Sequence, residues 1–167
     1  SDKPDLRNPL EICDVTEVFA REDVAFKAFK GTIEKGGVVR AIRAPNVADQ
    51  PRSFFDKLNS WAQGEGAPGL GYVLFEGEEG KGPIAKFIPE AAQSALKEIS
   101  GAQSGDAIFF ICNMEDKAAK FAGAARDAIC NALPQGHEAA REQGVYKFCW
   151  IVDFPMYEFD EKAQKID

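Results

Sequence analysis

The spacing of hydrophobic positions changes several times along the chain, and each change marks the border of a predicted element. Two runs rich in β-forming residues, 24–31 and 31–45, flank Glu34-Lys35-Gly36-Gly37. A Gly-Gly pair between two such runs is typical of a hairpin turn, and Pro45 ends the second run. The pattern therefore predicts a pair of antiparallel strands in the first third of the chain.

The spacing becomes helical from residue 52 onward. One face of the predicted helix carries Phe54, Phe55, Leu58, Trp61 and Ala62. A second helical stripe runs over 91–99, and a third runs over 118–133 after Asn113, a residue type suited to capping a helix. Three amphipathic helices are therefore expected.

Further strands are predicted between and after these helices. Residues 70–76 return to strand character, and Asp106–Cys112 is apolar on both faces, which suits a central strand better than an edge strand. A last strand, Tyr146–Asp153, would leave the domain. The order β-β-α-β-α-β-α, followed by this strand, favours an α+β fold. We expect a two-layer sandwich with a mainly antiparallel sheet and helices packed on one face.

The composition limits the class of protein. Of the 167 residues, 20 are Lys or Arg and 27 are Asp or Glu, so the formal net charge is −7. Strong independent binding of nucleic acid is not expected, because it normally needs a basic face that neutralises phosphates. No apolar run approaches the roughly 20 residues needed to span a bilayer, so no membrane partner is expected. The start on Ser1-Asp2-Lys3, without Met, predicts a piece of a longer protein.

Cysteine and histidine give no sign of a metal or nucleophilic site. The single histidine, His137, lies in the polar stretch 135–143, where we expect a solvated loop. We interpret the cysteines as buried free thiols of a protein in a reducing compartment, which agrees with a cytoplasmic location. None of the four forms a C-x-x-C pair with another: they are Cys13, Cys112, Cys130 and Cys149.

The sequence contains no familiar catalytic motif. The segment 80–83 (GKGP) lacks the spacing and the hydroxyl group of a phosphate-binding loop. Carboxylate pairs such as Glu78-Glu79 and Glu115-Asp116 fall in predicted turns and helix starts, where acidic residues are usual. We therefore predict no catalytic, cofactor-binding or metal-ligating residue in this chain.

Two groups of basic residues are the remaining candidates for a binding surface. The first group, Lys30, Arg40 and Arg43, flanks the predicted hairpin, and the second, Lys81 and Lys86, brackets an apolar segment. A local positive patch on an acidic body can meet a phosphate backbone. The alternative is that these are scattered surface charges, and the sequence leaves both interpretations open.

Two boundary segments and five internal segments of the chain carry a family resemblance. They are 1–7 (SDKPDLR) and 150–158 (WIVDFPMYE) at the boundaries, and 40–45 (RAIRAP), 69–72 (GLGY), 83–87 (PIAKF), 105–110 (GDAIFF) and 123–126 (GAAR) between them. The internal segments resemble the inserted GAD domain of bacterial-type aspartyl-tRNA synthetases. The boundary segments resemble the places where the chain of that family leaves and re-enters the class II catalytic domain.

The resemblance implies a fold, an activity and a division into parts. The GAD domain is a two-layer, DCoH-like α/β domain, and the parent enzyme activates aspartate with ATP and Mg²⁺ before it charges aspartate tRNA. Residues 1–10 would be an arm from the catalytic domain, 11–145 the GAD insertion, and 146–167 a strand and tail that return to the catalytic domain. The family's ATP-holding motifs are missing here. The chain alone is therefore expected to be inactive and to bind no cofactor.

Several roles remain open for such a domain. As an accessory insertion it would help to position tRNA or brace the catalytic domain. Contacts to tRNA would come from Lys30, Arg40, Arg43, Lys81 and Lys86, with weak or no binding by the chain alone. The alternative is a protein-interaction module that docks an amidotransferase or a partner subunit, and small-molecule sensing is a third possibility. We predict the first role, within a ligase that is cytoplasmic and homodimeric.

Overall fold

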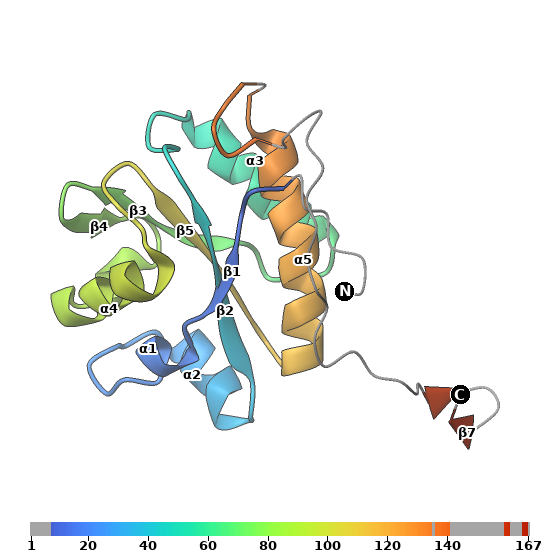
Figure 1. Cartoon of the computed structure of the whole chain (residues 1–167). Coiled ribbons are helices and arrows are strands. Elements are labelled where there is room, and N and C mark those ends of the chain that lie inside the picture. The colour runs from blue at the N-terminus through green and yellow to red at the C-terminus, as the bar shows by residue number, and fades with distance from the viewer. Residues whose placement is uncertain (1–7, 135, 141–158, 161–164, 167) are drawn as a thin grey trace.

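A computed structural model describes residues 8–134, 136–140, 159–160 and 165–166 of the chain. Five main helices and five main strands form one domain (Figure 1). In chain order the elements are β1 (Ile12–Asp14), α1 (Thr16–Phe19), α2 (Lys27–Glu34), β2 (Val38–Ala44), α3 (Arg52–Gly64), β3 (Gly71–Glu76), β4 (Glu79–Lys81), the 3₁₀ turn η1 (Ala85–Phe87), α4 (Glu90–Ser100), β5 (Ala107–Asn113), α5 (Glu115–Ala132), β6 (Phe159–Asp160) and β7 (Lys165–Ile166).

The five-stranded sheet is antiparallel throughout and has the order β1-β2-β5-β3-β4. The long strand β2 pairs with β5 over its whole length, from Val38 opposite Asn113 to Ala44 opposite Ala107. The double-sided apolar pattern of Asp106–Cys112 correctly predicts the central strand, because β5 lies between β2 and β3. The α+β class and the antiparallel sheet are thus confirmed.

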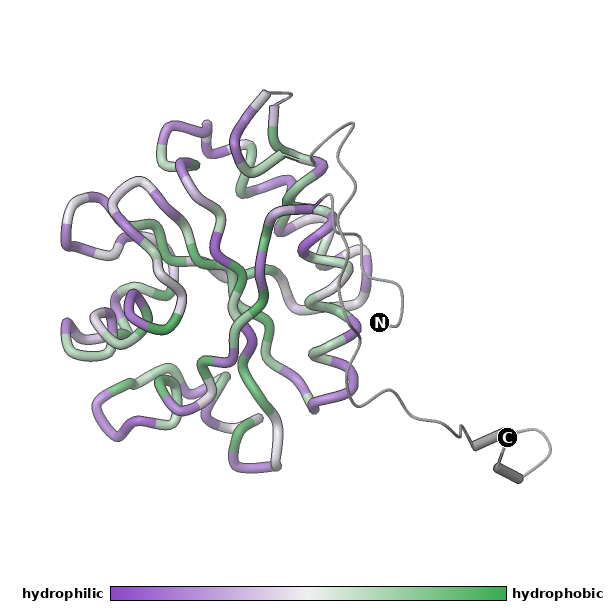
Figure 2. The backbone as a smooth tube through the Cα atoms, viewed as in Figure 1, coloured by the Kyte–Doolittle hydropathy of each residue, from purple (hydrophilic) through white to green (hydrophobic). Residues whose placement is uncertain are grey.

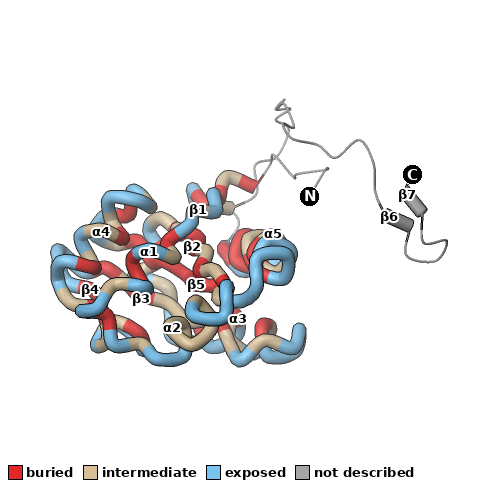
Figure 3. The backbone as a smooth tube through the Cα atoms, turned by 90° about the horizontal axis from the view of Figure 1, so that it is seen from below, coloured by how far each residue is buried: buried red, intermediate tan, exposed pale blue. Residues whose placement is uncertain are grey.

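Helices cover both faces of this sheet, so the predicted two-layer sandwich with helices on one face is corrected to three layers (Figures 1 and 3). Helices α3 and α5 pack on the face that carries Ile42 and Phe109, whereas α1, α2 and α4 pack on the face that carries Val39 and Phe110. The apolar residues gather on the central strands (Figure 2). Both faces of β2 and β5 are apolar, and each face therefore needs its own cover of helices.

The first predicted strand, 24–31, is wrong, because residues 27–34 form helix α2. Phe26, Phe29 and Ile33 recur at spacings of three and four, and all three pack against the core cluster under this helix. Two phenylalanines in a short run resemble β-forming sequence, but their spacing is helical. The Gly-Gly segment then ends α2 rather than joining two strands, with Gly36 in the left-handed region at φ 90°.

Two other regions of the sequence prediction have different outcomes. The three helices predicted from residue 52 onward are confirmed as α3, α4 and α5, and the run 70–76 is confirmed as β3. The predicted strand Tyr146–Asp153 lies outside the described residues, as does most of the arm predicted over 1–10.

A buried carboxylate connects three segments at one end of the central strand. Asp106, only 2% exposed, directly precedes β5. It accepts hydrogen bonds from the Arg43 guanidinium at 2.8 Å, the backbone N–H of Gln103 at 2.8 Å and the backbone N–H of Asn46 at 3.0 Å. Asn46 has a positive φ of 51°, a strained conformation that this bond helps to hold. The ends of β2 and β5 are therefore fastened to each other.

We expect Asp106→Ala to lower the free energy of unfolding by about 3 kcal/mol, because it leaves two backbone donors and the Arg43 guanidinium without their acceptor. Urea unfolding followed by circular dichroism measures this loss. Asp56→Ala is the matched control, since Asp56 is exposed and lies 3.9 Å from Arg52, and we expect it to cost less than about 0.5 kcal/mol. Equal losses in the two variants would contradict the anchoring role of Asp106.

Candidate functional site

The five basic residues predicted to contact tRNA lie on four different elements. Arg40 and Arg43 are three positions apart on β2, so they point to opposite faces of the sheet. Lys81 lies on β4, which is separated from β2 by two strands. Lys30 lies on α2 and Lys86 on η1. The structure therefore does not gather all five into one positive patch.

Most of these cations already have an acceptor within the domain. Arg40 pairs with Asp14 and lies 3.5 Å from Glu115, and Arg43 is bound to the buried Asp106. Both arginines therefore form ion pairs that stabilise the fold.

The three lysines differ in how they are held. Lys81 lies 2.5 Å from Glu76, and the Lys30 ammonium donates to the Arg21 carbonyl at 2.5 Å. Lys86 is exposed and lies over the Phe87 ring, with its nitrogen 5.1 Å from the ring centroid. Among the described residues, Lys30 and Lys86 form no salt bridge with a carboxylate.

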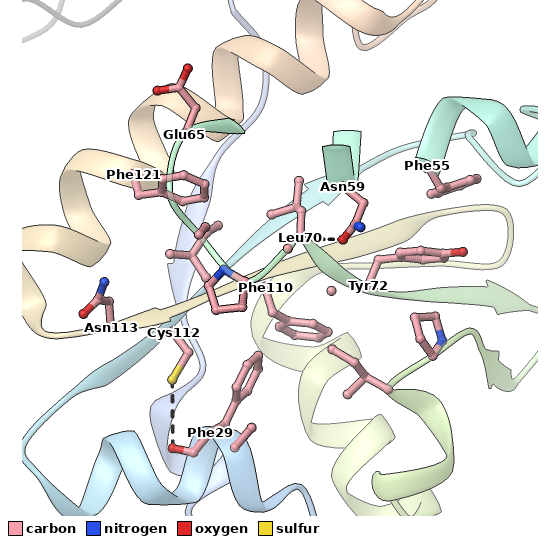
Figure 4. Close-up of a pocket in the computed structure, with 18 of the residues that line it drawn as sticks. Phe29, Phe55, Asn59, Glu65, Leu70, Tyr72, Phe110, Cys112, Asn113 and Phe121 are labelled. Atoms are coloured by element: carbon pink, nitrogen blue, oxygen red, sulfur yellow. Dashed lines mark hydrogen bonds between the residues drawn. The ribbon is translucent and has the colours of Figure 1, made fainter. Parts of the chain in front are cut away.

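A groove of about 1200 Å³ lies at the end of the sheet where β3 begins and β5 ends (Figure 4). We call it the sheet-end groove. Its walls come from the first turns of α2, from one face of α3, from segment 65–72, from segment 82–84, from the end of β5 and from one face of α5. None of the five predicted tRNA contacts lines it. The sequence analysis therefore did not predict this groove.

Aromatic side chains form much of the inner surface of the groove. Phe29 packs edge-on near Phe110, with ring centroids 6.3 Å apart, and Tyr72 stacks on Phe55 at 4.5 Å. Phe121 of α5 lies toward the other side, as Figure 4 shows. An apolar inner surface of this kind binds apolar side chains or rings rather than ions.

The charged residues of the groove stand on separate walls. Arg52 and Asp56 lie on α3, 3.9 Å apart, and Glu65 follows the end of that helix. Lys117 and Lys120 lie on the first turns of α5, where both are exposed. Within the described part of the chain neither lysine has a carboxylate partner at 4.0 Å or less. The α5 wall therefore offers two positive charges to a ligand.

The cysteine in the groove is expected to be a poor nucleophile. Cys112 lines it from β5, and its sulfur lies 3.9 Å from the Phe29 carbonyl oxygen. Burial raises the pKa of the Cys112 thiol, and a contact with Thr32 opposes this in part. Burial likewise raises the pKa values of Cys13 and Cys130. A thiol with a raised pKa has little thiolate at neutral pH and is a poor nucleophile.

The described residues give no geometry for metal chemistry or for membrane insertion. They contain no group of three or more His, Cys, Asp or Glu residues arranged to hold a metal ion. His137 joins loop 136–140 to the turn after β2, because one ring nitrogen lies 2.7 Å from the Asn46 carbonyl oxygen and the other accepts from the Ala139 N–H at 3.0 Å. No helix in the described ranges is long and apolar enough to cross a bilayer.

The sequence contained only indirect signs of the groove. Segment 64–71 holds four glycines and a proline, a composition typical of a turn or loop. Nothing in its composition indicates that β3 begins opposite Phe110 and so does not pair with the last residues of β5. Only the register, in which β3 starts at Gly71 opposite Phe110, places the opening.

Comparison with known proteins gives a consistent assignment. A family model described as "GAD domain" matches residues 29–122. An "Aspartate--tRNA(Asp/Asn) ligase" of Methylocella silvestris is 60% identical over 171 residues, which is 100% of this chain and 27% of the relative. Ligases of the same name from Beijerinckia indica and Methylorubrum extorquens are 59% and 58% identical, over 100% and 99% of this chain and 28% and 27% of their own lengths. The chain thus spans about a quarter of the curated relatives that it matches.

We expect alkylation of Cys112 by iodoacetamide at pH 7.5 to be slower than that of the cysteine of a short unstructured peptide with blocked ends in the same tube. Because the pKa of Cys112 is raised, less of it is thiolate at this pH, and its rate should keep rising at alkaline pH after the rate of the free thiol has levelled off. Mass spectrometry of the Cys112 peptide over time measures both rates. Equal rates of the two thiols at pH 7.5 would contradict the prediction.

Proposed function

Because the chain belongs to the GAD domain family, we propose that it is the accessory inserted domain of an aspartate–tRNA ligase. The observation that carries the proposal is the 60% identity to the Methylocella silvestris ligase along the full length of this chain. Identity at this level is not confined to the GAD segment, since the match extends over both flanks of residues 29–122. The three relatives named above are all ligases, which favours this role over a separate docking module.

The proposed reaction of the whole protein takes place outside this chain. The parent would activate aspartate with ATP and Mg²⁺ and transfer it to tRNA, a reaction that depends on positioning and on charge neutralisation at the phosphates. No catalytic residue is assigned to this chain, and by itself it is proposed to bind neither ATP nor Mg²⁺. Because the relatives' names include both tRNAs, we propose that the parent charges asparagine tRNA as well as aspartate tRNA.

Within the parent, the domain is proposed to brace the catalytic part and to add a few weak contacts to tRNA. Bracing is supported by the ion pairs that Arg40 and Arg43 form within the domain, because these pairs stabilise the fold and already neutralise both side chains. Among the five candidates, Lys30 and Lys86 are the best placed for phosphate contact. Lys30 lies on α2 and Lys86 on η1, and the backbone N–H of Ala25, just before α2, bonds to the carbonyl of Phe87 in η1 at 3.2 Å.

Other properties of the parent are proposed on the same basis. It is proposed to be a cytoplasmic homodimer, with the rest of the ligase chain as the direct partner of this domain. Weak or absent binding of tRNA by the isolated chain is expected from its net charge of −7.

We expect the double variant Lys30→Glu/Lys86→Glu, made in the whole protein, to raise the KM for aspartate tRNA about threefold to tenfold, because about two phosphate contacts are lost. Aspartate-dependent ATP–pyrophosphate exchange, which needs no tRNA, should be unchanged. Steady-state aminoacylation over a salt series measures the effect. Lys57→Glu/Lys120→Glu is the matched control, with the same change of charge at exposed positions of α3 and α5.

The outcomes separate the two parts of the proposal. If the whole protein charges no aspartate tRNA, the ligase assignment is wrong. If it charges tRNA normally and the two double variants behave alike, the contact to tRNA is wrong and bracing remains.

A further inference from the structure

The central strand β5 extends beyond its neighbour β3 at the sheet-end groove. Strand β3 pairs with β5 only from Gly71 opposite Phe110 to Leu74 opposite Ala107. Residues 111–113 of β5 are paired with β2 on one side, and no strand of the described part of the chain pairs with them on the other. We call this side of residues 111–113 the open edge of β5, and it faces the sheet-end groove.

The backbone of Cys112 points into this opening. Neighbouring residues of an antiparallel strand direct their N–H and C=O groups to opposite sides. The N–H of Phe75 on β3 donates to the Asp106 carbonyl at 2.9 Å, and the Phe75 carbonyl accepts from the Gly105 N–H at 2.8 Å. Asp106 therefore faces β3, and so do the backbone groups of every second residue after it: Ile108, Phe110 and Cys112.

The partner strand confirms this alternation. The residue opposite Cys112 on β2 is Val39, whose own N–H and C=O bond to Thr16 and Val15 on the far side. Among the described residues, neither the N–H nor the C=O of Cys112 has a hydrogen-bond partner. One donor and one acceptor are therefore available to a ligand.

The two walls beside the open edge have different chemistry. Cys112 faces the side of α2, where Phe29 and Thr32 line the groove. Ile111 packs in the cluster on the other face, beneath α5. On that side Lys117, Lys120 and Phe121 line the groove at helical spacing. A strand added at the open edge would therefore meet an aromatic wall on one of its faces and a positively charged wall on the other.

We propose that the sheet-end groove binds an extended segment of a partner protein as an additional strand beside β5. The geometry defines the sequence that it takes. A residue opposite Cys112 points its side chain toward Phe29, so it is apolar, and its two neighbours point toward Lys117 and Lys120, so they are acidic. The ligand is thus an acidic–apolar–acidic peptide, held by two backbone hydrogen bonds at Cys112.

Charge favours a peptide over RNA as the occupant. The groove is lined by three cations and two anions, with Arg52 already near Asp56, so only the two α5 lysines are available to a ligand. A phosphate at every nucleotide would place negative charge along the α3 wall too, beside Asp56 and Glu65. Two acidic side chains on alternate positions of one strand match the two lysines. This inference does not depend on the proposed ligase function.

The test uses the isotope-labelled 167-residue chain and three synthetic peptides. The first peptide is Gly-Thr-Asp-Val-Glu-Thr-Gly, with blocked ends, and the second replaces Asp and Glu by Lys. The third is the first peptide methylated on the valine nitrogen, which removes the donor to the Cys112 carbonyl. Its matched control carries the methyl on the glutamate nitrogen, which points away from β5 in the proposed register.

We expect the first peptide to shift the amide resonances of residues 110–113 and 117–121. The affinity of the lysine peptide should be lower by a factor of about five or more, because two ion pairs are replaced by repulsion. Methylation of the valine nitrogen should weaken binding about tenfold, whereas methylation of the glutamate nitrogen should leave it unchanged. Lys117→Glu leaves one positive and one negative charge on the α5 wall, so it should abolish the preference between the two peptides, whereas Lys57→Glu, which has the same charge change outside the groove, should preserve it.

Three results would overturn the proposal. One is the absence of shifts at residues 110–113 with millimolar peptide. The second is equal loss of affinity with the two N-methylated peptides, which would mean that no strand pairs at Cys112. The third is tighter binding of a single-stranded RNA heptamer than of the acidic peptide at the same residues, which would assign the groove to nucleic acid.

Discussion

Burial of β5 on both faces is the constraint on which the rest of the domain depends. Five consecutive residues, 107–111, are buried, and the strand has neighbours on both sides. Such a strand must be covered by helices on both faces, which explains why α5 and α3 lie on one side and α1, α2 and α4 on the other. Asp106 fixes the position at which this strand starts, because its carboxylate accepts hydrogen bonds from three segments. The donors are Arg43 on β2, the N–H of Asn46 in the turn after β2, and the N–H of Gln103 in the loop before β5.

The same constraint produces the groove. Since β5 is longer than the part of β3 beside it, the described residues leave one corner of the sheet uncovered between α2 and α5. Unpaired strand edges are usually protected by short length, charge or covering loops. Here the open edge is only three residues long and is flanked by Lys117 and Lys120, so it is protected from uncontrolled pairing while it remains accessible to a complementary strand.

The basic residues illustrate what separates a candidate from a site. Sequence alone could list Arg40 and Arg43 as phosphate contacts, because it shows charge without the partners that neutralise it. In the fold, cross-strand pairing places Asp14 beside Arg40, and the buried end of β5 places Asp106 beside Arg43. Conversely, nothing in the sequence distinguishes Lys117 and Lys120 from other charges on a helix, and only the neighbouring opening gives them a possible ligand.

The sequence by itself determined the amphipathic helices α3, α4 and α5, the central strand and the family, because periodicity and short motifs are local properties. It did not determine α2. Phe26, just before this helix, and Phe29, within it, suit a strand as well as a short helix, and the contact of Phe29 with Phe19, at 4.9 Å between ring centroids, forms only in the folded domain. The third layer, the register between β3 and β5 and the partners of each charge were decided by tertiary structure. They depend on contacts between residues far apart in the chain, such as Arg43 with Asp106, and these leave no periodic signal.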